Sequence, residues 1–248
     1  MTINEVPNMG GSTISNKLIN KLIKELKSGM FSGADRLPSE LELAEQFGVS
    51  RTVIRDALGT LEREGFIERG RGIGTIVHRN VVNMVNRFDL KYEYNLLVQN
   101  MGYKPGVDNV KLSERQADED LAEKLDLDVG DTVIVCEKRI LANEKPVIYS
   151  FDHFPKKLFI DLDLKKMDWS RPVFDLLEEY CEIKVDTDIT YIKPTNGTPH
   201  IRKMLELKCD EALLLLDEMG YYKLSKTILH SYGFYTDFFD FVMLRKYL

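Results

Sequence analysis

Residues 37–58 constrain the fold of this chain more than any other stretch. Ser39 and Glu42 have the spacing of a Ser-x-x-Glu capping box, which predicts the start of a helix. Gly48 predicts the end of that helix. Ser50 can cap a further helix directly afterwards. Two short helices joined by a tight corner are typical of a helix-turn-helix, which presents its second helix to the DNA major groove.

The helix that follows Ser50 is predicted to have one apolar and one polar face. Its apolar stripe consists of Ile54, Ala57, Leu58 and Leu61. Arg51, Thr52 and Arg55 then point away from the core near the helix N-terminus. There Arg can bind guanine bidentately and Thr can bond a base or phosphate, while Ser50 and the free N–H groups favour a phosphate. The alternative is that both arginines are solvated charges on an ordinary helical bundle.

Residues 66–77 predict a β-hairpin with a tip of Gly and Arg. Such a tip lets the backbone approach phosphates or a minor groove closely. A helix with an apolar stripe, ending at Gly29, is predicted before the helix-turn-helix. Residues 1–78 therefore predict a winged helix-turn-helix domain that binds double-stranded DNA. The expected contacts are Arg36, Ser39, Ser50, Arg51, Thr52, Arg55, Arg71 and Gly72.

Charge and cysteine content limit the class of protein. The net charge is −6, but residues 1–80 hold 11 Lys and Arg against 10 Asp and Glu, so the acidity lies in the remainder. A nearly neutral module can still bind DNA if its positive charge is concentrated on one face. Cys136, Cys181 and Cys209 fit neither a disulfide framework nor a metal site. Without a signal pattern or a long apolar run, we expect a cytoplasmic protein that does not contact a membrane.

Residues 79–92 have the composition of a linker, and residues 93–248 predict a second domain. We expect helices and β-strands here, forming an antiparallel sheet with helices on one side, so that the whole chain is α+β. The expected helices are 118–125, 172–180 and 199–205. The expected strands are 132–141, 146–154, 186–193, 212–222 and 227–244, the last broken at Thr236 and Asp237.

The sequence gives little support for an enzyme. Its four histidines occur in unrelated contexts, and we find no nucleophile motif, phosphate loop or metal-ligand spacing. Asp186 and Asp188 alternate along an expected strand, which makes a metal site there a weaker alternative. We expect no catalytic residue, metal or cofactor.

Residues 13–78 resemble the winged-helix domain of the GntR family of bacterial transcription regulators. The similarity rests on Leu37-Pro38-Ser39-Glu40, Leu43-Ala44, Val49 to Thr52, Arg55 to Leu58, Leu61-Glu62, Gly65-Phe66-Ile67 and the Gly72-x-Gly74-Thr75 motif. The resemblance implies DNA contacts at Arg51, Thr52, Arg55 and Gly72. Leu41 replaces an Arg usual in the family, and Val53 replaces a frequent Thr. Both departures imply a changed operator preference.

Residues 91–248 resemble the UTRA effector domain of the HutC-type branch, whose fold is similar to chorismate lyase. The similarity rests on Gly102, the 122–131 run, Lys138 to Ala142, Pro146, Pro155, Tyr235, Asp237 and Phe241. It implies a small anionic metabolite held near Arg139, whose guanidinium suits oxyanions. Further candidates are Ser170, Phe174, His230 and Tyr235. Alternatively, Arg139 forms a structural ion pair with Glu137 or Asp152.

The resemblance implies a homodimeric regulator, a repressor by preference, that reads a palindromic operator and answers to an anionic effector. Leu229 stands where sugar-phosphate-sensing members often have Glu. We therefore hypothesise an anionic effector less polar than an amino-sugar phosphate. Two alternatives remain open: a constitutive DNA-binding protein whose second domain only dimerises, and an enzyme similar to chorismate lyase.

Overall fold

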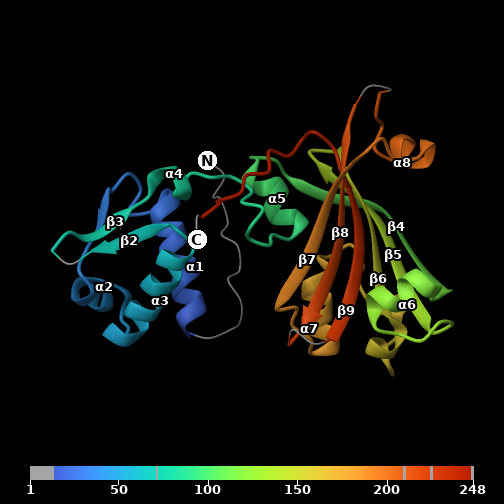
Figure 1. The fold of residues 1–248 in the computed structure, drawn as a ribbon, viewed down its shortest axis with the longest axis horizontal. Helices are drawn as coiled ribbons and strands as arrows, with labels where there is room; N and C mark the ends of the chain where they lie inside the picture. Colours follow the sequence, from blue (N-terminus) through green and yellow to red (C-terminus); the bar gives the residue numbers. More distant parts are fainter. Residues whose placement is uncertain (1–13, 71, 209–210, 224–225, 247–248) are drawn as a thin grey trace. The chain divides into compact units, whose positions relative to one another are not determined.

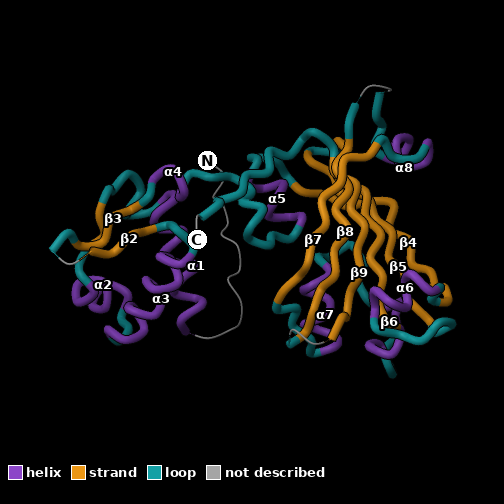
Figure 2. Tube along the Cα trace, in the orientation of Figure 1, coloured by secondary structure: helices purple, strands orange, loops and turns teal. Residues whose placement is uncertain are grey.

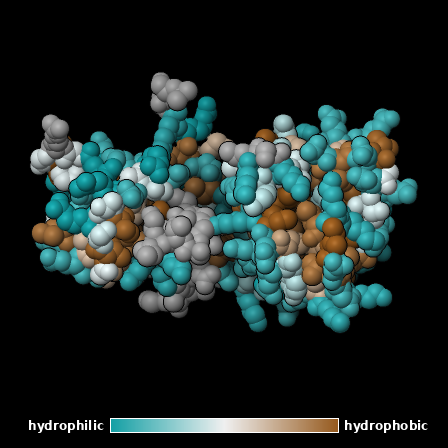
Figure 3. All heavy atoms as spheres, turned by 90° about the horizontal axis from the view of Figure 1, so that it is seen from below, coloured by the Kyte–Doolittle hydropathy of each residue, from teal (hydrophilic) through white to brown (hydrophobic). Residues whose placement is uncertain are grey.

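The computed structural model describes residues 14–70, 72–208, 211–223 and 226–246, with the side chains from residue 17 onward. The chain divides into two compact units. Unit 1 comprises residues 1–92, 99–102 and 240–248, and unit 2 comprises residues 93–98 and 103–239. Within the described residues, no helix is long and apolar enough to cross a membrane. Polar side chains cover much of each unit in the view of Figure 3, with apolar patches between them.

Unit 1 contains a compact group of helices and a small antiparallel sheet (Figure 1). Its helices are α1 (Ile14–Ser28), α2 (Glu40–Phe47), α3 (Arg51–Arg63) and α4 (Arg79–Val82). Its strands are β1 (Arg36–Leu37), β2 (Ile67–Gly70) and β3 (Gly74–Val77), in the order β1-β3-β2. This is a winged helix-turn-helix, as the sequence predicted, with β2 and β3 forming the wing.

Local capping sets the helix boundaries in unit 1. The Ser39 Oγ accepts from the backbone N–H of Glu42, and the Glu42 carboxylate accepts from the backbone N–H of Ser39, which completes the predicted capping box. Gly48 ends α2 with φ of 66°, in the left-handed region that favours glycine. Ser50 caps α3 through a hydrogen bond from the N–H of Val53. These contacts fix the corner between α2 and α3.

The segment that follows the wing, around Arg87, packs against the C-terminal end of α3. Arg87 is 1% exposed and donates from Nη1 to the carbonyl oxygen of Glu64, 2.8 Å away, at the C-terminal end of α3. Arg87 also pairs with the Asp89 carboxylate. Close to the C-terminus, Val242 accepts from the N–H of Phe88 at 2.6 Å. The described residues near the C-terminus thus pack with unit 1.

Unit 2 is built on a six-stranded antiparallel sheet of order β4-β5-β6-β9-β8-β7 (Figure 2). The strands are β4 (Pro105–Gln116), β5 (Thr132–Ala142), β6 (Lys145–Pro155), β7 (Thr187–Thr195), β8 (Leu213–Tyr222) and β9 (Lys226–Tyr235). The helices are α5 (Tyr94–Asn100), whose last two residues group with unit 1, α6 (Glu119–Leu125), α7 (Val173–Cys181) and α8 (Pro199–Met204), with 3-10 turns η1 (Lys156–Phe159) and η2 (Leu164–Lys166).

Helices cover both faces of this sheet, so the expectation of helices on one side is wrong. The core under α7 joins Leu176 and Leu177 to Ile134 and Cys136 of β5. On the opposite face, a second core joins Ile201 of α8 to strand residues, and α6 packs there on Val133. Because successive strand residues point to opposite faces, each strand position can be assigned to the α7 face or to the α6/α8 face.

The three predicted helices of unit 2 are confirmed, as are its strands up to Tyr235. The predicted strand does not resume after the break: residues 238–246 contain only an isolated bridge at Val242, and residues from 240 onward belong to unit 1. Two elements were missed: the helix α5 and the long edge strand β4. The residues of β4 are half-buried or exposed throughout and show no apolar alternation. An edge strand of this kind has little core-facing signal from which to predict it.

Candidate DNA-reading face and effector pocket

The helix α3 presents its N-terminal polar residues to solvent. Arg51, Thr52 and Arg55 are exposed. The opposite face is inaccessible, since Ile54, Ala57, Leu58 and Leu61 are each 0% exposed. Arg51 makes no hydrogen bond or ion pair with any described residue. The geometry therefore leaves the first turn of α3 available to a base edge or a phosphate.

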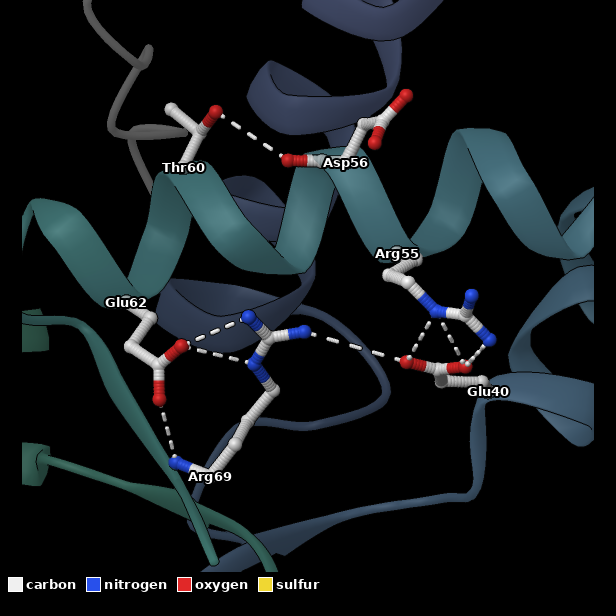
Figure 4. A network of polar contacts seen from close by, with 6 residues as sticks. All are labelled: Glu40, Arg55, Asp56, Thr60, Glu62 and Arg69. Atoms are coloured by element: carbon white, nitrogen blue, oxygen red, sulfur yellow. Dashed lines mark hydrogen bonds and ion pairs between the residues drawn. The ribbon is translucent and has the colours of Figure 1, made fainter.

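Glu40 ties the two helices of the motif together (Figure 4). Its carboxylate accepts from Nε and Nη2 of Arg55, with Nη2 3.0 Å from Oε2. Arg69 of β2 lies 3.9 Å from the same carboxylate and binds Glu62 of α3 at 2.7 Å. The hydrogen bonds from Arg55 hold the pKa of the Glu40 carboxyl below its ordinary value. Glu40 thus restrains the orientation of Arg55 on the DNA-reading face.

The wing places further predicted contacts beside this helix-turn-helix. Arg36 of β1 donates to the carbonyl oxygen of Ile73, near the wing tip. Gly72 has φ of 76°, and no atom lies within 4 Å of the position that a Cβ would take there. Its backbone is therefore open to close approach. Arg71 lies outside the described residues. Ser39 and Ser50 act as helix caps, and their side chains are engaged with the backbone.

The five predicted effector residues do not lie on one face of the sheet. Ser170 and Phe174 flank the N-terminus of α7, and Tyr235 lies on the α7 face of β9, next to Gly233. A Cβ at Gly233 would lie 2.5 Å from the Tyr235 ring, so the absence of a side chain leaves room for this ring. Arg139 and His230 lie on the α6/α8 face.

Arg139 is committed to a structural ion pair. Its guanidinium binds both carboxylate oxygens of Asp108 at 2.7 Å, and it also contacts Glu206 and the carbonyl oxygen of Met204 in α8. The alternative expectation of a structural ion pair thus describes its contacts, although the partners are Asp108 and Glu206 instead of Glu137 or Asp152.

His230 belongs to a buried group under α6. Its Nε2 lies 2.8 Å from the Asp217 carboxylate, which is 3.8 Å from Lys124 Nζ. Burial lowers the pKa of His230, and it lowers the pKa of the neighbouring His153 to about 4. Both imidazoles are therefore held neutral near pH 7. This group supports the sheet on the face away from Ser170 and Phe174.

The α7 face carries a polar cluster that the sequence prediction missed, which we call the inner cluster: Lys138, Ser150, Asp152 and Ser231. Lys138 is 2% exposed, its Nζ donates to the carbonyl oxygen of Arg171 at 3.0 Å, and it lies 3.7 Å from Asp152. Ser231 donates to Asp152 at 2.7 Å. The Ser150 Oγ and the Asp152 Oδ2 have no hydrogen-bond partner among the described residues.

Buried polar atoms without partners are uncommon, because each costs about 1–3 kcal/mol. The inner cluster therefore has the chemistry of a ligand site, with a buried ammonium, a carboxylate and a hydroxyl next to the N-terminus of a helix. Lys138 is the neighbour of the predicted Arg139, and it points to the other face. One sequence signal could have indicated this cluster. Lys138 follows Ile134 and Cys136 at two-residue spacing, so it lies on the same face of β5 as these apolar residues.

Comparison with known protein families agrees with both units. Residues 14–77 match the model described as bacterial regulatory proteins, gntR family, and residues 100–236 match the UTRA domain. The UTRA match covers more than half of the chain. The chain belongs to the GntR family, in its UTRA-containing branch. It is accordingly a DNA-binding transcription regulator.

Two curated proteins illustrate what this GntR-family chain is similar to. It is 25% identical over 219 residues to the HTH-type transcriptional repressor NagR of Bacillus subtilis, covering 88% of each chain. It is 24% identical over 240 residues to the mannosyl-D-glycerate transport/metabolism system repressor MngR of Escherichia coli, covering 96% of this chain and 98% of MngR. The crystal structure of PhnF from Mycobacterium smegmatis has the same fold, with a TM-score of 0.60, 23% identity, and coverage of 94% and 99%.

The three positions expected to depart from the family pattern, Leu41, Val53 and Leu229, have distinct surroundings. Leu41 is 52% exposed on α2. Val53 is partly buried against the core of unit 1. Leu229 is 3% exposed and packs in the core under α7. Leu41 thus offers an apolar surface to solvent, and Leu229 adds apolar surface to the α7 core.

Proposed function

We propose that this protein is a homodimeric repressor whose affinity for a palindromic operator is controlled by a small anionic metabolite bound on the α7 face of unit 2. The observation that carries the proposal is the inner cluster, in which a buried ammonium lies beside two buried oxygen atoms, of Ser150 and Asp152, that make no hydrogen bond to a described residue. A domain that only dimerises has no need of such a cluster, since unsatisfied buried polar atoms destabilise the fold.

The DNA half of the proposal rests on the exposed first turn of α3. Arg51, Thr52 and Arg55 approach the bases, while Arg36 and the wing around Gly72 contact the backbone. One such module contacts only a few base pairs. Two modules related by a twofold axis read half-sites about one helical turn apart, which favours a dimer and a palindrome.

The effector half of the proposal rests on charge and hydrogen-bonding capacity. Lys138 provides a cation for a carboxylate or phosphate, Ser150 provides a hydroxyl, and Asp152 provides an acceptor for ligand hydroxyl groups. The name of the relative MngR includes mannosyl-D-glycerate, a compound with a carboxylate and several hydroxyls. Leu229 on this side of the sheet favours a ligand with an apolar portion over an amino-sugar phosphate.

A binding experiment tests the proposal as a whole. A duplex enriched from random DNA by the full-length protein is titrated in a mobility-shift assay, with and without a panel of sugar acids and sugar phosphates. We expect at least one anion to weaken operator binding. If the operator is bound but no anion changes its affinity, the constitutive alternative is correct. If light scattering gives a monomer with and without DNA, the dimer mechanism fails.

A further inference from the structure

The N-terminus of α7 is capped by a residue from a distant part of the chain. The backbone N–H of Phe174 donates to the carboxylate of Glu93, 3.0 Å away. Pro172, at the N-cap position, makes no side-chain cap. The first N–H groups of a helix carry partial positive charge and bind carboxylates and phosphates. Glu93 therefore occupies a position that suits an anionic ligand.

This position adjoins the inner cluster. Tyr94, the neighbour of Glu93, donates from its hydroxyl to the carbonyl oxygen of Ser170. The Lys138 Nζ lies 5.2 Å from the centre of the Tyr94 ring and donates to the carbonyl oxygen of Arg171. The 170–174 turn is thus contacted by Glu93 and Tyr94 and also by Lys138. The oxygen atoms of Ser150 and Asp152 that make no hydrogen bond to a described residue belong to the same cluster.

Glu93 also stands at the boundary between the two units in the sequence. Unit 1 includes the chain up to Tyr92, and unit 2 begins with Glu93. Tyr92 is 7% exposed, and a few residues earlier Arg87 binds the carbonyl oxygen at the end of the recognition helix α3. Glu93 therefore directly follows the segment whose Arg87 contacts the C-terminal end of this helix.

We propose that Glu93 is a built-in competitor of the anionic effector. The ligand's carboxylate or phosphate replaces the Glu93 carboxylate at the N-terminus of α7, beside Lys138. Two anions at one helix N-terminus repel each other, so ligand binding expels Glu93 and with it the start of unit 2. The expelled segment changes the support of α3, and operator affinity falls. The inference rests on the proposed function, which it extends by naming the ligand group and the residue that it displaces.

If Glu93 competes with the anion, removal of its charge should strengthen anion binding. Glu93→Gln keeps a hydrogen-bond acceptor for Phe174 and removes the charge. Calorimetry with inorganic phosphate and with D-glycerate should show a Kd about tenfold lower in the variant than in the wild type, the scale of one charge interaction at a partly buried site. Structural damage would instead weaken binding. Glu178→Gln, an equal charge change on an exposed position of α7, should leave the Kd unchanged.

The outcomes separate the two proposals. If the wild type binds either anion and Glu93→Gln binds it no more tightly, the competition is refuted while the effector site stands. If neither protein binds either anion, and no anion shifts operator binding, the proposed effector site and the competition both fail. If the competition is correct, saturating anion should also change operator affinity less in Glu93→Gln than in the wild type. The anion does not repel the neutral side chain of the variant, so it does not displace this segment.

Discussion

Arg55 of α3 and Glu40 of α2 form an ion pair on the proposed DNA-reading face, with Nη2 and Oε2 3.0 Å apart (Figure 4). The side chain of Arg55 is 58% exposed and that of Glu40 is 27% exposed, so the pair adds little to folding stability. The effect of the pair is to fix the orientation of the Arg55 guanidinium. The carboxylate holds two nitrogens of the guanidinium and leaves Nη1 for a partner. In the proposed complex, the same carboxylate also places a negative charge on the face that approaches DNA phosphates.

Glu40→Gln should therefore change specificity more than stability. Loss of the carboxylate should strengthen binding to random DNA by about 0.5 kcal/mol at low salt, because repulsion from phosphates is removed. Discrimination between the selected duplex and random DNA should fall, because Arg55 loses its charged partner. Fluorescence anisotropy at two salt concentrations measures both quantities. Glu45→Gln, an exposed charge elsewhere on α2, provides the control. Improved discrimination in Glu40→Gln would contradict the orienting role.

Arg51→Ala should weaken specific DNA binding by about 1–3 kcal/mol, since this Arg has the exposure and position of a base-reading side chain. Thermal stability should stay the same because Arg51 contacts no described residue through a hydrogen bond or ion pair. Arg63→Ala, at the other end of α3, is the matched control and should cost less. Equal losses in the two variants would mean that the reading face lies elsewhere.

Unit 2 should lose stability as the pH falls from about 6.5 towards 4. Burial depresses the pKa of His153 to about 4 in the folded state, whereas the unfolded value is near 6.5. The proton therefore binds the unfolded chain first, so the contribution of His153 is complete above pH 6.5. It is lost at up to about 1.4 kcal/mol per pH unit below that value.

Urea unfolding followed by Trp169 fluorescence measures this effect, since the only tryptophan of the chain is buried in unit 2. His153→Asn retains a donor to the carbonyl oxygen of His230, which His153 Nδ1 contacts at 3.1 Å, and it removes the titrating group. The variant should show a shallower loss of stability between pH 6.5 and 5. An identical pH dependence in both proteins would show that other groups dominate.

The sequence predicted the winged helix because its signals are local. The capping box at Ser39, the helix end at Gly48 and the cap at Ser50 each involve residues at most a few positions apart, and the structure contains each of them. The wing follows from a hairpin pattern of the same kind. Contacts of this range depend on backbone preferences that the neighbouring residues determine.

The effector pocket could not be predicted in the same way. The buried positions Val133 to Cys136 form an unbroken run, so the phase of β5 cannot be deduced from alternation. Arg139 was expected from the family resemblance, and it lies on the face opposite to Lys138. A shift of one residue moves a side chain to the other face of a sheet. The bond from Phe174 to Glu93 spans 81 positions, and only the folded chain brings these residues together.

Lys138 and Asp152 provide the sharpest test of the inner cluster. Lys138→Met should abolish binding of phosphate or D-glycerate, and it should also destabilise unit 2 by about 3–5 kcal/mol, because Asp152 remains buried without its cation. The double variant Lys138→Met with Asp152→Asn removes both charges, and Asn can still accept from Ser231. Much of the stability should therefore return in the double variant, since neutral replacement of a buried ion pair costs little. Anion binding should not return. Recovered binding in the double variant would show that the anion is held by another part of the domain, whereas recovered stability without binding assigns the ammonium of Lys138 to the ligand.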